Sequence, residues 1–350
     1  MKTKGNEQNL IKFDRNGNPS GSTGTVFKVS TGSYMVCVDG RMLSCTQVYA
    51  PDKRAGKLAG GGKSRRGQKD DRPTFTPRTI VVGDRVRLAE GTNGSGRILA
   101  VEPRRSTLSR RSAVPMPGAH AHEQVIAANV DQVVPVFAAA NPAPKWNMLD
   151  RYLALAEAMD LPSLIVITKI DLAQDAQGSI DSELLAAVDE YRRLGYTVIL
   201  TSAVSGYGLA ELRESLRAGL SVLLGKSGVG KTALLNALQP GLGLRVKEVS
   251  RATGKGVHTT TQSEIFPLDS GGAIIDTPGV REFGLWDIDG EELAYFYREI
   301  APLVGSCRFG LDCRHDEEPG CAVRRAVAAG QVSPRRYQSY LRLAEELGAS

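Results

Sequence analysis

Leu220-Ser-Val-Leu-Leu-Gly-Lys-Ser-Gly-Val-Gly-Lys-Thr-Ala-Leu-Leu-Asn236 joins an apolar strand to a helix-forming run through a glycine-rich turn. The turn consists of Gly225, Lys226, Ser227, Gly228, Val229, Gly230, Lys231 and Thr232. Backbone N–H groups in such a turn can cradle a di- or triphosphate at the start of the helix. We expect Lys231 to reach the outer phosphates and the Thr232 hydroxyl to ligate Mg²⁺. The alternative is a glycine turn that only joins the strand to the helix.

The composition of the 350 residues indicates a multidomain protein with packed cores, since 41% of them are hydrophobic. The N-terminal residues are polar and the chain has no apolar run of about 18 residues, so we expect a cytoplasmic protein that does not enter a membrane. Three of the five cysteines lie near a histidine late in the chain. That placement suits a reduced compartment and a metal site better than a disulfide framework.

Positive charge is concentrated in two segments, although the net charge is only +6. Residues 51–72 carry eight Lys or Arg against three Asp, and residues 97–111 carry five Arg against one Glu. Segments of this kind meet polyanions, above all the phosphates of nucleic acid. The alternative for the first segment is a solvated, variable surface loop. Few aromatic residues accompany these charges, so we expect contacts with a nucleic-acid backbone rather than base stacking.

The patterns along the chain predict three domains after a flexible tail at residues 1–20. Residues 21–115 contain about five short strands separated by tight turns, which favours a five-stranded oligonucleotide-binding β-barrel interrupted by the basic loop 51–77. Residues 120–285 alternate strands and helices, with strands near 130–137, 163–171 and 197–202. This alternation predicts an α/β domain with a parallel sheet and a ligand at the carboxyl ends of its strands. Residues 286–350 form a small helical domain.

Two polar motifs end predicted strands that precede the phosphate-binding turn. Thr168-Lys169-Ile-Asp171 ends one strand, and Ser202-Ala203 ends the next. The Asp171 carboxylate can accept two hydrogen bonds from the N1 and N2 donors of guanine, a pair that adenine lacks, while the Lys169 stem can lie over the base. Alone, the first motif is also compatible with a helix cap or a surface ion pair.

Two further motifs follow the phosphate-binding turn. In Ala273-Ile-Ile-Asp-Thr-Pro-Gly279, Asp276 can hold the Mg²⁺ shell and the Gly279 amide can sense the γ-phosphate. Gly254-Lys-Gly-Val-His-Thr-Thr-Thr261 is a flexible segment suited to a switch, with Thr259 or Thr260 as the contact to Mg²⁺ and the γ-phosphate. Together the motifs favour a GTPase, which binds GTP and GDP, over an adenine-nucleotide enzyme.

The order of these motifs differs from that of a conventional small GTPase, in which the phosphate-binding turn comes first and the base motifs come last. Here the base motifs precede the turn, so the domain is circularly permuted. Only the connectivity changes, and the spatial site is preserved. The permutation places the switch segments directly before the C-terminal domain, to which the nucleotide state can therefore be transmitted.

A cluster with the spacing Cys-x5-Cys-x-His-x5-Cys lies in the C-terminal domain and consists of Cys307, Cys313, His315 and Cys321. Three thiolates and one imidazole complete a tetrahedral Zn²⁺ shell with no open position, so we expect one structural zinc per chain. The alternative is a set of unligated buried cysteines. The predicted helices at 290–303 and 334–347 are too short for a large core, so the metal would hold this domain together. Four arginines near the cluster offer either a second RNA-facing surface or ordinary solvated charge: Arg308, Arg314, Arg324 and Arg325.

Five segments closely resemble the ribosome small subunit-dependent GTPase A family, the circularly permuted YjeQ-type GTPases. They are residues 225–232, His258-Thr-Thr-Thr261, Asp276-Thr-Pro-Gly-Val-Arg-Glu-Phe-Gly-Leu-Trp286, Pro103-Arg-Arg-Ser-Thr-Leu-Ser-Arg110 and the cysteine cluster. The resemblance covers about residues 21–345. It implies an oligonucleotide-binding barrel, a permuted GTPase core, a zinc domain, and a role in late maturation of the small (30S) ribosomal subunit, which stimulates GTP hydrolysis. The sequence departs from the family in two places: Thr168 stands where Asn is usual, and residues 51–77 are longer and more basic.

The residue after Gly279 is Val280, where Ras-like enzymes carry the Gln that orients the attacking water. Intrinsic hydrolysis should therefore be slow and await a group from the switch or from a partner. His258 is our candidate for the water-positioning residue, which the resemblance supports; the alternative is a histidine that only packs or hydrogen-bonds in its loop.

We therefore expect a monomeric, Mg²⁺-dependent GTPase that binds the small ribosomal subunit and its 16S rRNA through the barrel and the zinc domain. Its hydrolysis of GTP would time its release from that particle. One alternative is a nucleotide-gated RNA-binding protein whose hydrolysis is incidental, which the absence of a Gln after Gly279 keeps open. Another is a metal-handling GTPase, which the closed zinc shell disfavours.

Overall fold

The computed structural model describes residues 21–47, 79–111, 123–242, 263–276, 288 and 290–348. The chain divides into two compact units, residues 1–104 and 105–350. The first unit ends at Arg104. The strand β6 (Thr107–Arg111) belongs to the second unit, in which it pairs with β7 (Glu123–Ala128).

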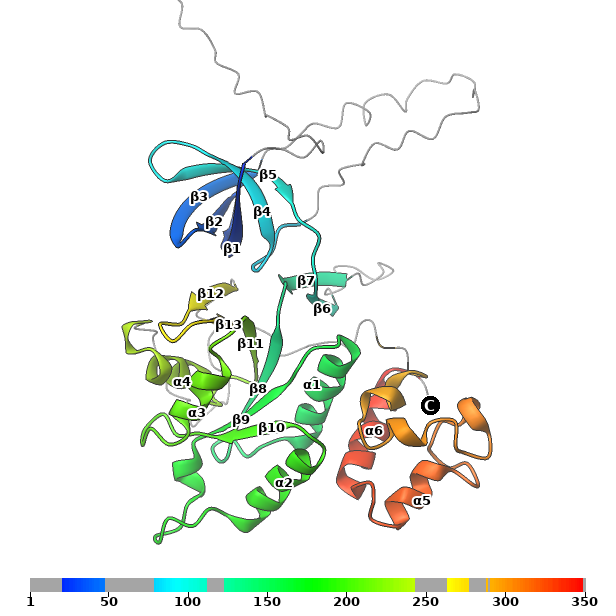
Figure 1. The fold of residues 1–350 in the computed structure, drawn as a ribbon. Helices are drawn as coiled ribbons and strands as arrows, with labels where there is room; N and C mark the ends of the chain where they lie inside the picture. The colour runs from blue at the N-terminus through cyan, green and yellow to red at the C-terminus, as the bar shows by residue number, and fades with distance from the viewer. Residues whose placement is uncertain are drawn as a thin grey trace, which may run out of the picture. The chain divides into compact units, whose positions relative to one another are not determined.

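The first unit is a closed five-stranded barrel (Figure 1). Its strands are β1 (Ser22–Ser30), β2 (Ser33–Val38), β3 (Arg41–Gln47), β4 (Arg85–Glu90) and β5 (Ser95–Val101). β1, β2 and β3 form an antiparallel meander, β3 runs parallel to β5, and β4 pairs with both β5 and β1, which closes the ring. Alternating residues point inward and build an aliphatic core that includes Val26, Val36, Leu43, Val86, Leu88 and Ile98.

Arg104, one of the arginines of the basic segment 97–111, forms an ion pair within the first unit. The Arg104 guanidinium donates to both carboxylate oxygens of Asp84, at 2.7 and 2.9 Å, and to the Thr79 carbonyl at 2.8 Å. Asp84 is fully buried and also accepts a hydrogen bond from the Val81 N–H. This ion pair corrects the expectation that Arg104 meets a polyanion, because a buried carboxylate needs the guanidinium as its partner.

The second unit contains the expected parallel sheet (Figure 1). Its strand order is β10-β9-β8-β11-β13-β12, and all of these strands run parallel except β12, which is antiparallel to β13. The bounds are β8 (Gln132–Ala138), β9 (Leu164–Thr168), β10 (Thr197–Leu200), β11 (Leu220–Leu224), β12 (Glu264–Pro267) and β13 (Ala273–Asp276). The predicted strands near 130–137, 163–171 and 197–202 are thus confirmed as β8, β9 and β10.

Helices pack on both faces of this sheet, which explains why nearly all residues of its central strands β8 and β11 are apolar. On one face, the β8 residues Val134 and Val136 share a core with α3 (Leu209–Ser215) and α4 (Lys231–Leu238). On the other face, Phe137 meets Tyr152 of α1 (Trp146–Ala158), and α2 (Ser182–Arg193) contacts β10. The described core strands therefore place their carboxyl ends, and the loops that follow them, along one edge.

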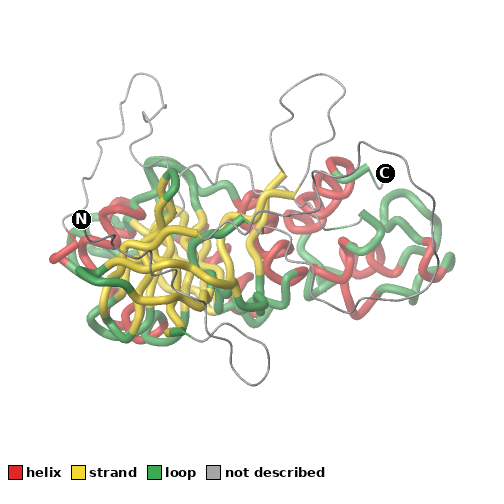
Figure 2. Tube along the Cα trace, turned by 90° about the horizontal axis from the view of Figure 1, so that it is seen from above, coloured by secondary structure: helices red, strands yellow, loops and turns green. Residues whose placement is uncertain are grey.

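The C-terminal part of the second unit consists of short helices joined by loops, as Figure 2 shows. It contains α5 (Ala322–Ala328), α6 (Pro334–Glu346) and the 3-10 turns η3 (Leu293–Phe296), η4 (Ala301–Leu303) and η5 (Gly310–Asp312). The predicted helix at 334–347 is confirmed as α6, whereas residues 290–303 form two 3-10 turns. Across the ranges that the structure describes, no helix is long and apolar enough to cross a membrane.

Two successive arginines, of which Arg336 is buried and Arg335 partly exposed, join this C-terminal part to the helices α1 and α2. Arg336 at the start of α6 is 1% exposed; it donates to Asp150 of α1 at 2.7 Å and pairs with Glu299. Arg335 pairs with Glu190 of α2 and donates to the Tyr191 hydroxyl at 3.0 Å. Burial by itself would lower the pKa of Arg336, but its bonds to Glu299 and the charge of Asp150 raise that pKa well above its ordinary value. This group of side chains is called the arginine joint below.

Candidate nucleotide site and metal centre

The phosphate-binding turn lies between β11 and α4, at the centre of the carboxyl edge of the sheet. Its glycines are required by close contacts and backbone conformation. A Cβ on Gly225 would lie 2.4 Å from the Val136 carbonyl oxygen, and Gly230 has φ +98° immediately before the first residue of α4. The Lys231 ammonium lies over the turn, where it donates to the carbonyls of Gly225 at 2.6 Å and Lys226 at 3.1 Å.

The first base motif contacts this turn directly. Thr168, at the end of β9, is 3% exposed, and its hydroxyl donates to the Val229 carbonyl of the turn. Lys169 has φ +58°, and its ammonium donates to the carbonyls of Gly228, at 2.7 Å, and Asn141. Burial lowers the pKa of Lys169, which the neighbouring Asp171 partly offsets. The first base motif and the phosphate-binding turn are therefore one hydrogen-bonded assembly.

Asp171 follows in the 3-10 turn η1 (Ile170–Ala173), at the same edge of the sheet. Its side chain is partly exposed. Within the described parts of the chain, we find no hydrogen bond or ion pair made by its carboxylate. Both oxygens are thus available to a ligand, as recognition of the two guanine donors requires.

The second base motif begins the loop after β10. Ser202 is fully buried, and its hydroxyl accepts hydrogen bonds from the N–H groups of Val204 and Ser205, at 3.2 and 3.1 Å. Its own N–H donates to the Tyr207 carbonyl at 3.0 Å. Ser202 therefore shapes this loop internally, which leaves the neighbouring Ala203 as the member of the motif that can face a ligand.

The motifs that follow the phosphate-binding turn are only partly described. Asp276 ends β13 and pairs in register with Leu223 of β11, so its backbone lies at the carboxyl edge beside the phosphate-binding turn. His258, Thr259, Thr260 and Gly279 lie outside the described residues. Their predicted roles therefore stay predictions.

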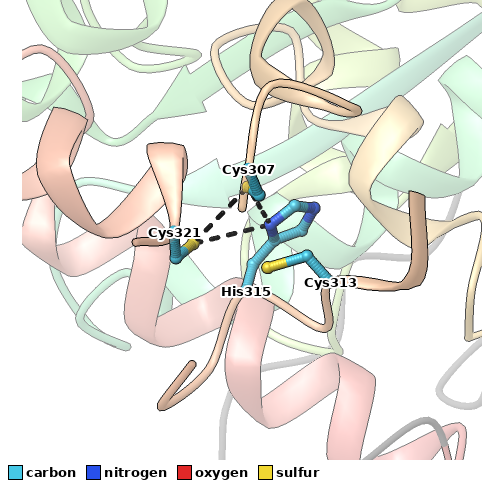
Figure 3. Close-up of side chains that lie close together, drawn as sticks. All are labelled: Cys307, Cys313, His315 and Cys321. Atoms are coloured by element: carbon cyan, nitrogen blue, oxygen red, sulfur yellow. Dashed lines mark hydrogen bonds between the residues drawn. The ribbon is translucent and has the colours of Figure 1, made fainter. Parts of the chain in front are cut away.

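The four predicted metal ligands come together in the C-terminal part, as Figure 3 shows. The ligand atoms of Cys307, Cys313, His315 and Cys321 all lie within 4.8 Å of one another, and all four residues are buried. His315 Nδ1 lies 3.4 Å from the sulfur of Cys307 and 3.6 Å from that of Cys321, and these two sulfurs are 3.9 Å apart. Four ligands around Zn²⁺ with Zn–S bonds of about 2.3 Å have nearly this separation. The cluster can therefore hold a zinc ion.

Burial and local hydrogen bonds shift the pKa values of the cluster side chains. Burial raises the pKa of Cys313 to about 12, and burial lowers the pKa of His315. For Cys307, burial raises the pKa of the thiol. Hydrogen bonds from the N–H groups of Ala322 and Val323 and from the neighbouring thiols lower it by more, so the net shift is downward. Zinc would bind the deprotonated thiolates and the neutral imidazole, so its binding would release protons from the cysteines.

The loops that carry the cluster are held by hydrogen bonds from α5 and α6. The Tyr337 hydroxyl donates to the His315 carbonyl at 2.6 Å, and the Ala322 N–H donates to the Cys307 sulfur at 3.1 Å. Arg324 and Arg325 donate to the carbonyls of Glu317 and Gly320, at 2.8 and 2.9 Å. At least two of the four arginines near the cluster thus support its loops.

Sequence reasoning missed two features of this unit. One is the Asn141 carbonyl, which holds the Lys169 ammonium; the only local signal was the turn-forming pair Asn141-Pro142 after a strand. The other is the arginine joint, whose members are spread over α1, α2, the turn between η3 and η4, and α6. No local pattern pairs charges that lie so far apart in the chain.

Comparison with known families matches residues 101–286 to the RsgA GTPase family. A curated relative from Gemmatimonas aurantiaca, named small ribosomal subunit biogenesis GTPase RsgA, is 47% identical over 271 residues, which cover 77% of this chain and 84% of the relative. A relative of the same name from Chlorobaculum parvum is 45% identical, with coverage of 77% and 85%.

Two solved structures are similar to the fold. The crystal structure of YjeQ from Thermotoga maritima superposes with a TM-score of 0.68 and 30% identity, covering 94% of this chain and 99% of that one. The crystal structure of YloQ, described as a circularly permuted GTPase, has a TM-score of 0.66 and 28% identity, with coverage of 94% and 95%. The permuted order of motifs is thus a feature of a known fold.

Proposed function

Because the chain belongs to the RsgA GTPase family, we propose that it hydrolyses GTP to GDP and phosphate during late maturation of the small ribosomal subunit, and that hydrolysis times its release from that particle. The observation that best supports this function is the assembly of the base motif and the phosphate-binding turn at one edge of the sheet. Its hydrogen bonds run between segments about 60 residues apart, such as Thr168 and Val229. A GTPase needs both segments on one nucleotide.

In this proposal each part of the edge has a separate task. The N–H groups of residues 225–232 and the Lys231 ammonium bind the phosphates, and Thr232 and Asp276 hold Mg²⁺. Asp171 selects guanine, with Lys169 and Ala203 beside the base. The Lys231 ammonium would exchange the carbonyls of Gly225 and Lys226 for phosphate oxygens, because anionic oxygens are the stronger acceptors.

Catalysis is assigned to the switch segment. We propose that His258 positions the attacking water and that Thr259 or Thr260 contacts Mg²⁺ and the γ-phosphate. Val280 offers no polar group for the water, so turnover would depend on a group that the ribosomal partner helps to place.

The other two domains provide binding to the particle. The five-stranded barrel, the basic segment 51–77 and the arginines of segment 97–111 other than Arg104 would contact 16S rRNA, and the Cys3His cluster would hold one structural zinc. We further propose that the protein is cytoplasmic, since the particle it serves is cytoplasmic, and that it acts as a monomer.

The test is GTP turnover with and without purified small subunits, using large subunits and the His258→Ala protein as controls. We expect strong stimulation by small subunits alone, and loss of that stimulation in the variant. Stimulation that survives the substitution would remove His258 from the mechanism and keep the partner. A chain that binds small subunits without any stimulated turnover would overturn the proposed use of hydrolysis.

A further inference from the structure

Three large apolar side chains are exposed at the edge of the sheet that carries the base motifs. Leu172 and Tyr207 are each 51% exposed, and Val204 is 89% exposed. Leu172 directly follows Asp171 in η1, and Val204 and Tyr207 lie in the loop after β10. These three residues are called the apolar edge patch below. The proposed nucleotide site uses none of their side chains.

The two loops that carry the apolar edge patch lie side by side. β9 and β10 are neighbouring parallel strands (Figure 1), with Ile167 opposite Leu200, so both loops leave the sheet at the same level. The Ile170 N–H then donates to the Thr201 carbonyl at 3.1 Å, which joins the start of one loop to the start of the other. Single exposed apolar residues are normal on a protein surface, whereas a group of them marks an interaction site.

Hydrogen bonds hold the loop after β10 in one shape. The Ser202 hydroxyl accepts from the N–H groups of Val204 and Ser205, at 3.2 and 3.1 Å. The Ser202 N–H donates to the Tyr207 carbonyl, and the Gly206 N–H donates to the Ser202 carbonyl, each at 3.0 Å. The loop therefore presents Val204 and Tyr207 with little conformational freedom left to lose when a partner binds.

The surface around the apolar edge patch is acidic, although the net charge of the whole chain is +6. Residues 169–183 and 201–212 contain five acidic residues against one lysine, Lys169, whose ammonium is bonded to the phosphate-binding turn. Asp181 caps α2 and Glu211 lies in the first turn of α3, so both charges are held where these helices begin. Four of the acidic residues are exposed: Asp175, Asp181, Glu183 and Glu211. A surface of this polarity repels nucleic acid and attracts a basic partner.

We propose that the apolar edge patch binds a basic protein segment of the small ribosomal subunit, rather than its rRNA. The inference rests on the proposed function, because the partner is taken from the particle that the chain is proposed to serve. A protein that sits on rRNA neutralises phosphates with lysines and arginines, so its surface complements the acidic side chains around the patch.

The two parts of this surface have different tasks. The apolar side chains supply the buried centre of the contact, and the acidic side chains form a polar rim that orients the partner. Leu172 directly follows Asp171, and Val204 directly follows Ala203. The protein contact therefore lies next to the place proposed for the guanine base.

Photocrosslinking of the full-length protein identifies the partner. Benzoylphenylalanine replaces Val204, and the protein is irradiated on purified small subunits with a non-hydrolysable GTP analogue; large subunits are the control. We expect a product that contains a protein of the small subunit. A product that contains 16S rRNA or only this chain, or the absence of any product, would overturn the inference.

A matched pair of substitutions measures the contribution of the patch to binding. Tyr207→Ser removes an exposed ring and keeps the backbone carbonyl that accepts from Ser202. Tyr295→Ser is the control, because Tyr295 is also 51% exposed but lies in η3. We expect Tyr207→Ser to weaken sedimentation with small subunits about tenfold, as for an aromatic anchor in an interface, and Tyr295→Ser to change it less than about twofold. Equal effects of the two substitutions would deny the patch a special role.

GDP titration of the same variants separates this inference from the proposed function. We expect Tyr207→Ser to bind GDP within about twofold of the unsubstituted protein, since its ring is no part of the proposed base site. A parallel loss of GDP affinity would assign the ring to the nucleotide pocket and overturn the docking role. An unsubstituted protein that does not bind small subunits would overturn the proposed function itself. Thermal unfolding checks that each variant is folded, and Val204→Ser carries the same measurements if Tyr207→Ser does not fold.

Discussion

Arg104 and Arg105 are neighbours in the sequence with opposite environments. Arg104 binds the fully buried Asp84, whereas Arg105 pairs with Asp131 at 3.2 Å while its side chain stays 69% exposed. We expect Arg104→Ala to destabilise the barrel by about 3 kcal/mol, because Asp84 keeps a buried charge without its partner. Arg105→Ala, the matched control, should cost less than about 1 kcal/mol. Hydrogen exchange of β1 and β4 peptides measures the difference, and equal protection in both variants would contradict it.

Cys313 allows a direct test of the metal centre at the level of one atom. Replacing its sulfur by the hydroxyl of Cys313→Ser removes one of four ligands and should release the zinc, because oxygen in this position binds the ion more weakly than a thiolate. Cys37→Ser is the control, since Cys37 lies in the barrel, outside the cluster. The measurement is zinc per chain after gel filtration. Full zinc content in Cys313→Ser would remove this residue from the ligand set.

The residue types of the site and their spacing could be predicted from the sequence. The partners that those residues contact could be predicted only in part. The grouping of Cys307, Cys313, His315 and Cys321 could be predicted because three cysteines and a histidine within 15 positions most often form a metal site when they are not in disulfides. The engagement of Arg104 could not, since a run of arginines does not reveal which one a distant aspartate needs. The bond from Thr168 to Val229 likewise depends on a turn that lies about 60 residues away in the chain.

At the scale of elements, α6 is held against α1 by ion pairs as well as by apolar contacts. Arg336 lies between Asp150 of α1 and Glu299, and all three side chains are almost completely buried. We expect Arg336→Ala to destabilise the docking of α6 by about 3–5 kcal/mol, because two carboxylates keep their buried positions without this cation. Arg342→Ala, on the exposed side of the same helix, should have little effect.

Hydrogen exchange of α6 and limited proteolysis test this expectation. Adding Asp150→Asn to Arg336→Ala should restore part of the protection, because it removes one of the two buried carboxylate charges that Arg336 pairs and leaves Glu299 as the other. Unchanged α6 protection in Arg336→Ala would show that apolar contacts alone hold the helix. The joint lies within the compact unit of residues 105–350, which includes both the sheet and the C-terminal part.

At the scale of the whole molecule, the permuted order of strands was visible because each motif could be recognised separately and then placed in sequence. The barrel was harder to delimit, since β6 has the alternation of a barrel strand yet pairs with β7 beyond the boundary at residue 104. Strand patterns show which face of a strand is buried and leave open which strand lies beside it. The pairing of β1 with β4, which closes the ring, could likewise not be predicted from the pattern of either strand.

The separation of tasks within the second unit leads to a prediction for the intact protein. The metal cluster lies on loops supported by α5 and α6, and we find no hydrogen bond or ion pair from those loops to the nucleotide motifs among the described residues. Removal of zinc by a chelator should therefore leave the affinity for GDP within about twofold, as expected for sites that share no partners. Small-subunit stimulation of GTP turnover should be lost, because the domain proposed to bind the particle loses the ion that holds its loops.

Fluorescent-GDP titration and stimulated turnover check the two expectations. Both are measured on the same chelated sample and again after zinc is returned. Equal loss of GDP affinity and stimulation would show that the metal centre supports the nucleotide site itself.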